Sequence, residues 1–334
     1  MLLGAVIVRW GLDSLRPLVS EIGIERPLCI TTGRLAGLCA SLFPGFGVRV
    51  FAGVRPHAGL GGVEGADEAA ADADGLVAVG GGSAIDTAKA VSSRRGLPVV
   101  SVPTTYSGAE WTPTFGMRDE ERRVKGGGGG ARVAGIVYEP ELTLGLPPAE
   151  SGGTAMNALA HCAEALYVRG RNDEADREAL AGARLIATHL PMVLSDGSDA
   201  DARRGLLEGA MHAGGALAGA GLGLAHAMAQ ALGGRHGAPH GALNAVCLPP
   251  ALRFNAEAVP AELARFAEAI AADDAAAGAE RLARLAGFER LRDLGVSADD
   301  LPEIAERVIE RPGAKANPRP ADAAAVESLL RSVF

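Results

Sequence analysis

The stretch VAVGGGSAIDTAK, residues 77–89, decides the fold of this chain. It predicts a short buried strand, a glycine turn and the first turns of a helix. Three consecutive glycines let the backbone approach a ligand closely, because no Cβ atom stands in the way. The helix start behind them offers unpaired N–H groups and a positive dipole end, which suit a phosphate. The stretch therefore indicates a pyrophosphate site, although such turns also serve packing and these glycines lack the spacing of the dinucleotide fingerprint.

Strands alternate with helices over the first hundred residues. We expect strands at Ala5–Trp10, Pro27–Thr31, Gly47–Ala52, Leu76–Val79 and Pro98–Val102, and helices at Leu12–Ile22, from Arg34 and at Glu64–Ala73. The last two strands are continuously apolar, as in strands that are buried on both faces of a parallel sheet. The pattern predicts a doubly wound, mostly parallel α/β domain, whose ligands bind at the carboxyl ends of the strands.

A run of five glycines, Gly126–Gly130, lies between two extended segments, Thr112–Met117 and Arg132–Tyr138. Glycine-rich connections are flexible, so we expect a surface loop here. A lid over a bound cofactor is the alternative.

From about Pro147 the chain turns to long segments rich in alanine and leucine with helical periodicity. We expect helices at 149–168, 173–190, 201–220, 224–233, 241–254, 258–271, 276–284, 300–310 and 320–332. No strand pattern interrupts them. The sequence therefore predicts an α/β nucleotide-binding domain over residues 1–146 and an all-helical substrate domain over residues 147–334.

Charge and composition narrow the class of partner. The 334-residue chain has a net charge of −8, which disfavours binding to nucleic acid phosphates. No apolar run is long enough to span a bilayer, and the first ten residues lack the features of a signal peptide. The four cysteines, Cys29, Cys39, Cys162 and Cys247, are scattered in apolar segments, which indicates reduced thiols in the cytoplasm.

Four polar side chains of the helical half are candidates for chemistry. Asn157 and His161 are four residues apart and share a helix face, whereas His226 and His240 each lie at the start of another helix. Three histidines from three helices could converge as a metal site or as a cluster that handles protons. Separate core histidines are the alternative.

Motifs run in order through nearly the whole chain. They are GGGSAIDTAK at 80–89, PTTYSGAEWTP at 103–113, YEPELTL at 138–144, AMNALAHCAEALY at 155–167, His226, the glycine pair 233–234, PH at 239–240 and NPRP at 317–320. This ordered set resembles the iron-containing alcohol dehydrogenase superfamily, and within it the maleylacetate reductase branch. The resemblance implies a dehydroquinate synthase-like fold, an active site in the cleft between the two domains, and a homodimer.

The resemblance also implies a nicotinamide cofactor, NADH or NADPH. The matching cofactor-binding positions are Gly80, Gly81, Gly82, Ser83, Asp86, Thr104, Thr105, Ser107, Lys125 and Thr32. Thr32 stands where many relatives carry an aspartate for the ribose hydroxyls. Because that carboxylate is missing and Arg34 follows, we expect NADPH to be accepted, either alone or alongside NADH.

The metal-dependent relatives hold their metal with an aspartate and three histidines, and the matching positions here are Asn157, His161, His226 and His240. A neutral amide in place of an anionic ligand should lower the affinity for a metal. The three histidines could still hold Fe²⁺ or Zn²⁺.

The resemblance implies reduction of maleylacetate to 3-oxoadipate, a late step in the catabolism of aromatic compounds. Asn157 and the three histidines are the candidate catalytic residues, and Arg235 and His236 are candidate partners for the carboxylates of this dicarboxylate substrate. The alternatives are a metal-dependent alcohol dehydrogenase that acts on a small alcohol or aldehyde, and a catalytically silent cofactor-binding protein.

Overall fold

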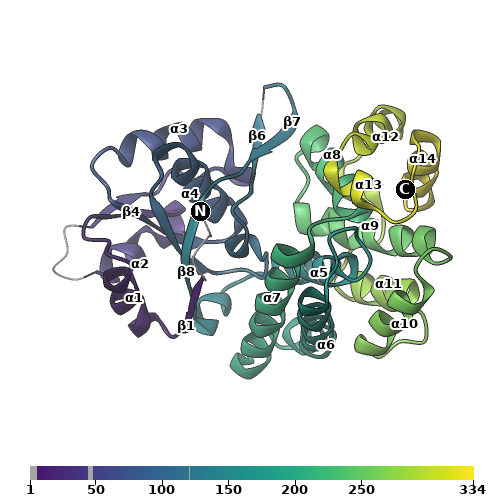
Figure 1. Cartoon of the computed structure of the whole chain (residues 1–334), viewed down its shortest axis with the longest axis horizontal. Coiled ribbons are helices and arrows are strands. Elements are labelled where there is room, and N and C mark those ends of the chain that lie inside the picture. The colour runs from purple at the N-terminus through teal and green to yellow at the C-terminus, as the bar shows by residue number, and fades with distance from the viewer. Residues whose placement is uncertain (1–5, 44–47, 120) are drawn as a thin grey trace. The chain divides into compact units, whose positions relative to one another are not determined.

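A computed structural model describes residues 6–43, 48–119 and 121–334, so Ala5 and Gly47, at the starts of two expected strands, lie outside the described residues. The chain forms two compact units (Figure 1). The first comprises the described residues up to Thr105 together with Ala109–Thr143, and the second comprises Tyr106–Gly108 and Leu144–Phe334. The assignment of cofactor binding to residues 1–146 and of substrate binding to 147–334 stays a prediction, because compact packing does not test binding.

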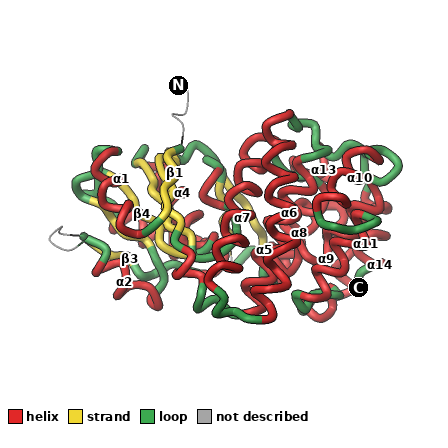
Figure 2. The backbone as a smooth tube through the Cα atoms, turned by 90° about the horizontal axis from the view of Figure 1, so that it is seen from below, coloured by secondary structure: helices red, strands yellow, loops and turns green. Residues whose placement is uncertain are grey.

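The first unit is built on a six-stranded sheet. Its strands are β1 (Ile7–Trp10), β2 (Pro27–Ile30), β3 (Arg49–Phe51), β4 (Gly75–Gly80), β5 (Pro98–Pro103) and β8 (Arg132–Tyr138), in the order β1-β8-β5-β4-β2-β3. Every neighbouring pair is parallel. Helices flank these strands, which lie side by side in Figure 2.

The alternation of side chains along β4 explains why both faces of the sheet are covered. Val77 and Val79 pack into one apolar cluster, which includes residues of α1 (Leu15–Glu21) and α2 (Ala36–Ser41). Leu76 and Ala78 pack into a second cluster with residues of α3 (Leu60–Ala69) and α4 (Gly82–Arg95). Successive residues of a strand point to opposite faces, so a continuously apolar strand requires helices on both. The predicted doubly wound fold is confirmed.

The prediction of a flexible loop at Gly126–Gly130 is wrong for the first three of these glycines. They lie in β7 (Val124–Gly128), which pairs antiparallel with β6 (Phe115–Asp119). A Cβ at Gly127 would lie 2.5 Å from the carbonyl oxygen of Phe115, so the absence of a side chain permits this close pairing. Composition indicated flexibility, but the hydrogen bonds of the ladder order the segment.

The second unit is all-helical, as predicted, and none of its residues, all of which are described, lies in a strand. Its helices are α5 (Pro148–Ala165), α6 (Asp173–Ser195), α7 (Ala200–Ala220), α8 (Leu224–His236), α9 (His240–Asn255), α10 (Pro260–Ala269), α11 (Ala275–Leu285), α12 (Leu301–Ile309), α13 (Pro312–Ala316) and α14 (Ala323–Ser332). The sequence did not predict α13, because five residues are too few to show a helical period.

Helix α5 is the centre of this unit. Apart from Thr154, every residue from Ser151 to Ala165 is buried. A helix that is buried all round must find partners inside the protein for every polar side chain it carries. The buried polar residues of α5 therefore indicate a candidate functional site.

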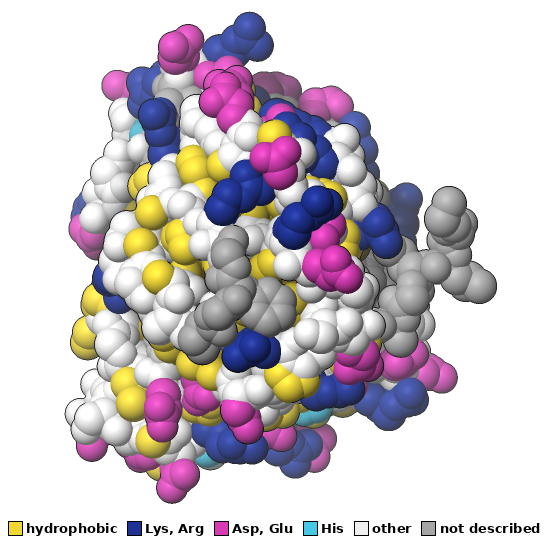
Figure 3. Space-filling view, turned by 90° about the vertical axis from the view of Figure 1, so that its left-hand side faces the viewer, with side chains coloured by type: hydrophobic (Ala, Val, Ile, Leu, Met, Phe, Trp, Pro, Cys, Tyr) yellow, Lys and Arg dark blue, Asp and Glu magenta, His cyan; other side chains and the backbone are white. Residues whose placement is uncertain are grey.

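The distribution of charged side chains on the surface and the state of the cysteines can be compared with what the composition indicated. On the face of the first unit shown in Figure 3, basic and acidic side chains are interspersed rather than gathered by sign. None of the described helices is both long enough and apolar enough to cross a membrane. All four cysteines are buried free thiols.

Small residues set the spacing of the helices in the second unit, which a glycine substitution can test. A Cβ at Gly182 in α6 would lie 2.9 Å from Sγ of Cys162 in α5 and 2.9 Å from the carbonyl oxygen of Gly209 in α7. We expect Gly182→Ala to lower the free energy of unfolding by about 1–3 kcal/mol, the cost of overpacking a core, in urea denaturation. Gly145→Ala is the control, because nothing lies within 4 Å of a Cβ there. Equal stability of the two variants would contradict this account of the packing.

Candidate active site

The glycine turn ends β4 and opens α4. Gly80 has a φ of 151°, which favours glycine, and Gly81 is the extended residue before the first turn of α4. No side chain caps this helix start, so its first N–H groups remain available to a ligand. A Cβ at Gly81 would lie 2.8 Å from Cγ2 of Thr105. The turn therefore forms a cradle that any side chain at Gly81 would crowd.

Two threonines at the end of the neighbouring strand border this cradle. The backbone N–H of Thr104 donates to the carbonyl of Gly80 over 3.1 Å, which ties the end of β5 to that of β4. The Oγ1 atom of Thr105 is buried and has no hydrogen-bond partner among the described residues. An uncapped helix start beside an unpaired hydroxyl fits the pyrophosphate of a dinucleotide.

Ser83 and Asp86 were also predicted to bind the cofactor, and both already bond to protein groups. The hydroxyl of Ser83 accepts from the N–H of His57 over 3.0 Å. Asp86 forms an ion pair with Lys89 over 2.9 Å and accepts from the backbone N–H of Gly116 over 3.1 Å, which gives its carboxylate a structural role.

Two further predicted residues, Thr32 and Lys125, belong to the first unit, whereas Ser107 belongs to the second. Thr32 precedes the 3₁₀ turn Gly33–Leu35, and Lys125 lies in β7. The first unit thus contains every predicted cofactor-binding residue except Ser107.

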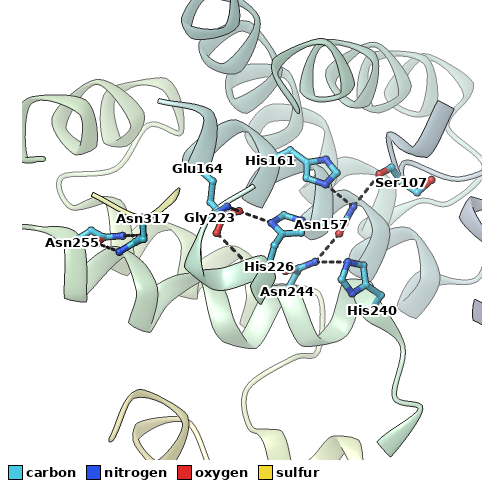
Figure 4. A network of polar contacts seen from close by, with 10 residues as sticks. All are labelled: Ser107, Asn157, His161, Glu164, Gly223, His226, His240, Asn244, Asn255 and Asn317. Atoms are coloured by element: carbon cyan, nitrogen blue, oxygen red, sulfur yellow. Dashed lines mark hydrogen bonds and ion pairs between the residues drawn. The ribbon is translucent and has the colours of Figure 1, made fainter. Parts of the chain in front are cut away.

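The second unit brings His161 of α5, His226 of α8 and His240 of α9 together (Figure 4). The rings of His161 and His226 stack, with centroids 4.6 Å apart and planes 15° apart, and the rings of His226 and His240 are 5.8 Å apart. Burial, and after it the neighbouring His226, holds the pKa of His161 well below its ordinary value, so His161 is neutral near pH 7.

Sequence reasoning missed the function of Glu164, one turn after His161. Its fully buried carboxylate accepts from the Nδ1 atom of His226 over 2.6 Å and from the backbone N–H groups of Gly223 over 2.7 Å and His226 over 3.2 Å. This places the proton of a neutral His226 ring on Nδ1 and leaves Nε2 as the reactive atom. A glutamate on the Asn157–His161 helix face, in an alanine-rich segment, was the available indication.

Asn157 and Asn244 form the second polar group of the cluster, and Asn244 was also missed. The Nδ2 atom of Asn244 lies 2.6 Å from Oδ1 of Asn157 and 3.2 Å from Nε2 of His240. The Nδ2 atom of Asn157 donates to the carbonyl of Ser107 over 3.0 Å and lies 3.5 Å from Nε2 of His161. Both polar ends of Asn157 are thus engaged by protein groups.

The short segment Tyr106–Gly108 is held by these same helices. The buried guanidinium of Arg203 in α7 donates to the hydroxyl of Tyr106 over 3.1 Å. Gly108 has a φ of 73°, and a Cβ there would lie 3.3 Å from Nδ1 of His161. The segment that carries Ser107 is therefore fixed against the histidine cluster.

This arrangement does not fit a divalent metal held by the three histidines. An imidazole binds a metal along a lone pair in the plane of its ring, and the stacked rings of His161 and His226 lie in nearly parallel planes. Nε2 of His240 faces the amide nitrogen of Asn244, and the neutral side chain of Asn157 supplies no anionic ligand. Among the described residues, no group of three or more histidine, cysteine or acidic side chains is arranged to hold a metal ion. Binding of a metal ion by these three histidines was predicted from the resemblance, and it remains untested.

The two residues proposed for the substrate carboxylates share one acidic partner. Arg235 pairs with Asp300 over 2.9 Å and His236 lies 3.3 Å from the other oxygen of the same carboxylate. Asp300 therefore already offsets positive charge at this end of α8.

Comparison with known proteins places this site in a family. A model described as "Iron-containing alcohol dehydrogenase" matches residues 6–133, and one described as "Fe-containing alcohol dehydrogenase family, C-terminal" matches residues 152–334. The fold and the site define an oxidoreductase, and the chain belongs to the iron-containing alcohol dehydrogenase family.

The similar proteins include two maleylacetate reductases and a 1,3-propanediol oxidoreductase. A maleylacetate reductase of Rhizobium sp. (strain MTP-10005) is 34% identical over 95% of this chain and 91% of its own. The crystal structure of maleylacetate reductase from Agrobacterium tumefaciens has a TM-score of 0.89 at 34% identity and covers 98% of this chain and 96% of its own. A structure of 1,3-propanediol oxidoreductase has a TM-score of 0.92 at 29% identity, with 98% of both chains covered.

The cradle at the glycine turn makes a direct prediction about cofactor binding. Because the side chain of Gly81→Val would fill the space next to Thr105, we expect the Kd for NADPH to rise about tenfold or more in a fluorescence titration. Circular dichroism should show an unchanged helical content. Gly37→Ala in α2 is the control, since nothing lies within 4 Å of a Cβ there. Wild-type affinity in Gly81→Val would show that the turn does not hold the cofactor.

Proposed function

We propose that this protein is an NAD(P)H-dependent maleylacetate reductase, which converts maleylacetate to 3-oxoadipate. The similarity to maleylacetate reductases over nearly the whole chain supports the substrate. The observation that carries the proposal is the amide at position 157. Both of its polar ends are occupied by Asn244 and Ser107, which supports a hydrogen-bonded cluster rather than a metal site.

Gly80–Ser83, Thr104 and Thr105 would hold NADH or NADPH, which supplies a hydride to the alkene carbon β to the ketone. Negative charge then develops on the ketone oxygen, and buried imidazole N–H groups of the cluster stabilise it. His161 is neutral, so it can donate a hydrogen bond without carrying charge into the site. His226, oriented by Glu164, is our candidate for the group that passes a proton from water to the α carbon: its Nε2 takes up the proton from water and then gives it to carbon.

Arg311 is our candidate for a substrate carboxylate, in place of Arg235 and His236. Its Nη1 atom donates to Oε1 of Gln230 over 3.2 Å, and Gln230 lies four residues after His226 on α8, on the same helix face. Its Nε atom is buried without a hydrogen-bond partner, and no carboxylate pairs with it among the described residues. A partly buried cation with unused donors, one side chain from the cluster, is suited to bidentate binding of a carboxylate.

The remaining assignments rest on the sequence. Thr32, with the exposed Arg34 two residues on, supports acceptance of NADPH beside NADH, because no carboxylate would repel a 2′-phosphate. The four free thiols support a cytoplasmic location, and the resemblance supports a homodimer.

The proposed reaction is tested by following the oxidation of NADH and of NADPH with maleylacetate and with a panel of small aldehydes, with and without a chelator. We expect turnover of maleylacetate that NADPH supports and that the chelator leaves unchanged. In D₂O with unlabelled cofactor, one deuterium should enter at the former alkene carbon α to the ketone, in addition to deuterium that the other α carbon takes up by exchange with solvent.

The outcomes separate the alternatives. Stoichiometric metal in the purified protein, with aldehyde reduction that is lost on chelation, would replace the proposal by a metal-dependent alcohol dehydrogenase. Binding of NADPH without turnover of any enone or aldehyde would replace it by a silent cofactor-binding protein.

The role of Arg311 predicts an effect on substrate binding alone. Loss of a hydrogen-bonded ion pair in Arg311→Gln should raise KM for maleylacetate about tenfold or more and leave the Kd for NADPH unchanged. Lys315→Gln, on α13 four residues on, is the matched control, because this exposed lysine pairs with Glu310. An unchanged KM in a folded Arg311→Gln protein would remove Arg311 from the site.

A further inference from the structure

A chain of four polar groups runs through the cluster from Ser107 to His240 (Figure 4). The carbonyl of Ser107 meets Nδ2 of Asn157 at 3.0 Å, and Oδ1 of Asn157 meets Nδ2 of Asn244 at 2.6 Å. The same Nδ2 atom lies 3.2 Å from Nε2 of His240. Asn244 is fully buried and Asn157 is 5% exposed, so these contacts lie inside the protein.

The direction of every hydrogen bond in this chain follows from its first member. A backbone carbonyl can only accept, so the atom of Asn157 that faces Ser107 must be the NH₂ group. The other end of Asn157 is then its oxygen, which can only accept, so Asn244 must also present its NH₂ group. Rotating either amide by 180° would bring two acceptors or two donors together at hydrogen-bond distance.

The last member of the chain is thereby determined. The second hydrogen of the Asn244 NH₂ group points to Nε2 of His240, so this nitrogen must accept and carries no proton. A neutral imidazole holds its single proton on the other nitrogen. We propose that Asn244 is a positioning residue, which fixes His240 as the Nδ1–H tautomer and so makes His240 a hydrogen-bond donor through Nδ1.

Amides are required at both positions for this relay to work. An ionised aspartate at 244 could only accept, so Nε2 of His240 would have to carry a proton, and in a neutral ring the donor at Nδ1 would be lost. An aspartate at 157 could still accept from Asn244, but it would place an anionic oxygen against the carbonyl of Ser107. The two changes therefore have different consequences for His240, although both replace one amide of the same pair.

The catalytic consequence rests on the proposed function. Reduction of an enone builds negative charge on the ketone oxygen, and a neutral N–H donor that is fixed in advance stabilises this charge without reorganisation. Asn244 would act on the reaction only through His240. Its effect should therefore fall on kcat, and the affinity for the cofactor should stay unchanged.

The tautomer can be read in the free enzyme without any substrate, from ¹⁵N NMR spectra of protein labelled at histidine. The signals of His240 are assigned by their loss in His240→Gln. In the wild type we expect a protonated, pyrrole-type Nδ1 and an unprotonated, pyridine-type Nε2. Asn244→Asp should interchange the two types, whereas Asn157→Asp should leave them as in the wild type.

The chain provides a matched control in a second buried amide pair. Asn255 and Asn317 exchange hydrogen bonds of 2.9 and 2.7 Å, and neither contacts a histidine of the cluster. Asn255→Asp introduces the same charge into a similarly buried pair, so it should cost comparable stability without changing the His240 signals. A protonated Nε2 in the wild type, or identical His240 signals in wild type and folded Asn244→Asp, would overturn the proposal.

Kinetics provide the second measurement. Loss of one preorganised donor should lower kcat of Asn244→Asp for maleylacetate by about 10²-fold or more, with the Kd for NADPH unchanged. Equal kcat in Asn244→Asp and Asn255→Asp would overturn the catalytic part of the proposal. A wild-type enzyme that binds NADPH but does not reduce maleylacetate would count against the proposed function instead, because the tautomer assignment is measured without substrate.

Discussion

The chemistry of the second unit depends on one constraint, which is that polar side chains buried around α5 hold one another in place. Asn157, His161 and Glu164 lie on one face of a helix that is covered on all sides. An unpaired buried polar group costs about 1–3 kcal/mol. The carboxylate of Glu164 and the amide of Asn157 therefore orient the histidines, and the orientation of each ring becomes a property of the fold rather than of the solvent.

The same constraint separates this cluster from a metal site built on the same positions. An anionic oxygen at position 157 would serve a cation but would face the carbonyl of Ser107. An amide serves both Ser107 and Asn244 and brings no charge into the buried site. Replacement of one carboxylate oxygen by an amide nitrogen thus converts a potential metal ligand into a member of a hydrogen-bonded frame.

Most of the architecture could be predicted from local patterns. The continuously apolar β4 and β5 predicted a parallel sheet covered on both faces, and the helical periodicity predicted an all-helical second half. Composition led to a wrong prediction at β7, where a flexible loop was expected. The glycines there belong to a strand, because the absence of side chains permits close approach to Phe115. The helical periodicity also missed α13, which is too short to show a period.

By itself the sequence determined the division into an α/β half and a helical half, and the glycine turn with its uncapped helix start. It also determined which histidines are candidates for chemistry. These follow from spacing and side-chain type, which are local. Only the tertiary structure decided that Glu164 orients His226, that Asn244 joins Asn157 to His240, and that Arg235 pairs with a carboxylate whereas Arg311 bonds to Gln230. These roles depend on contacts between helices far apart in the chain, and hydrogen-bond direction is settled only when every partner of a buried group is known.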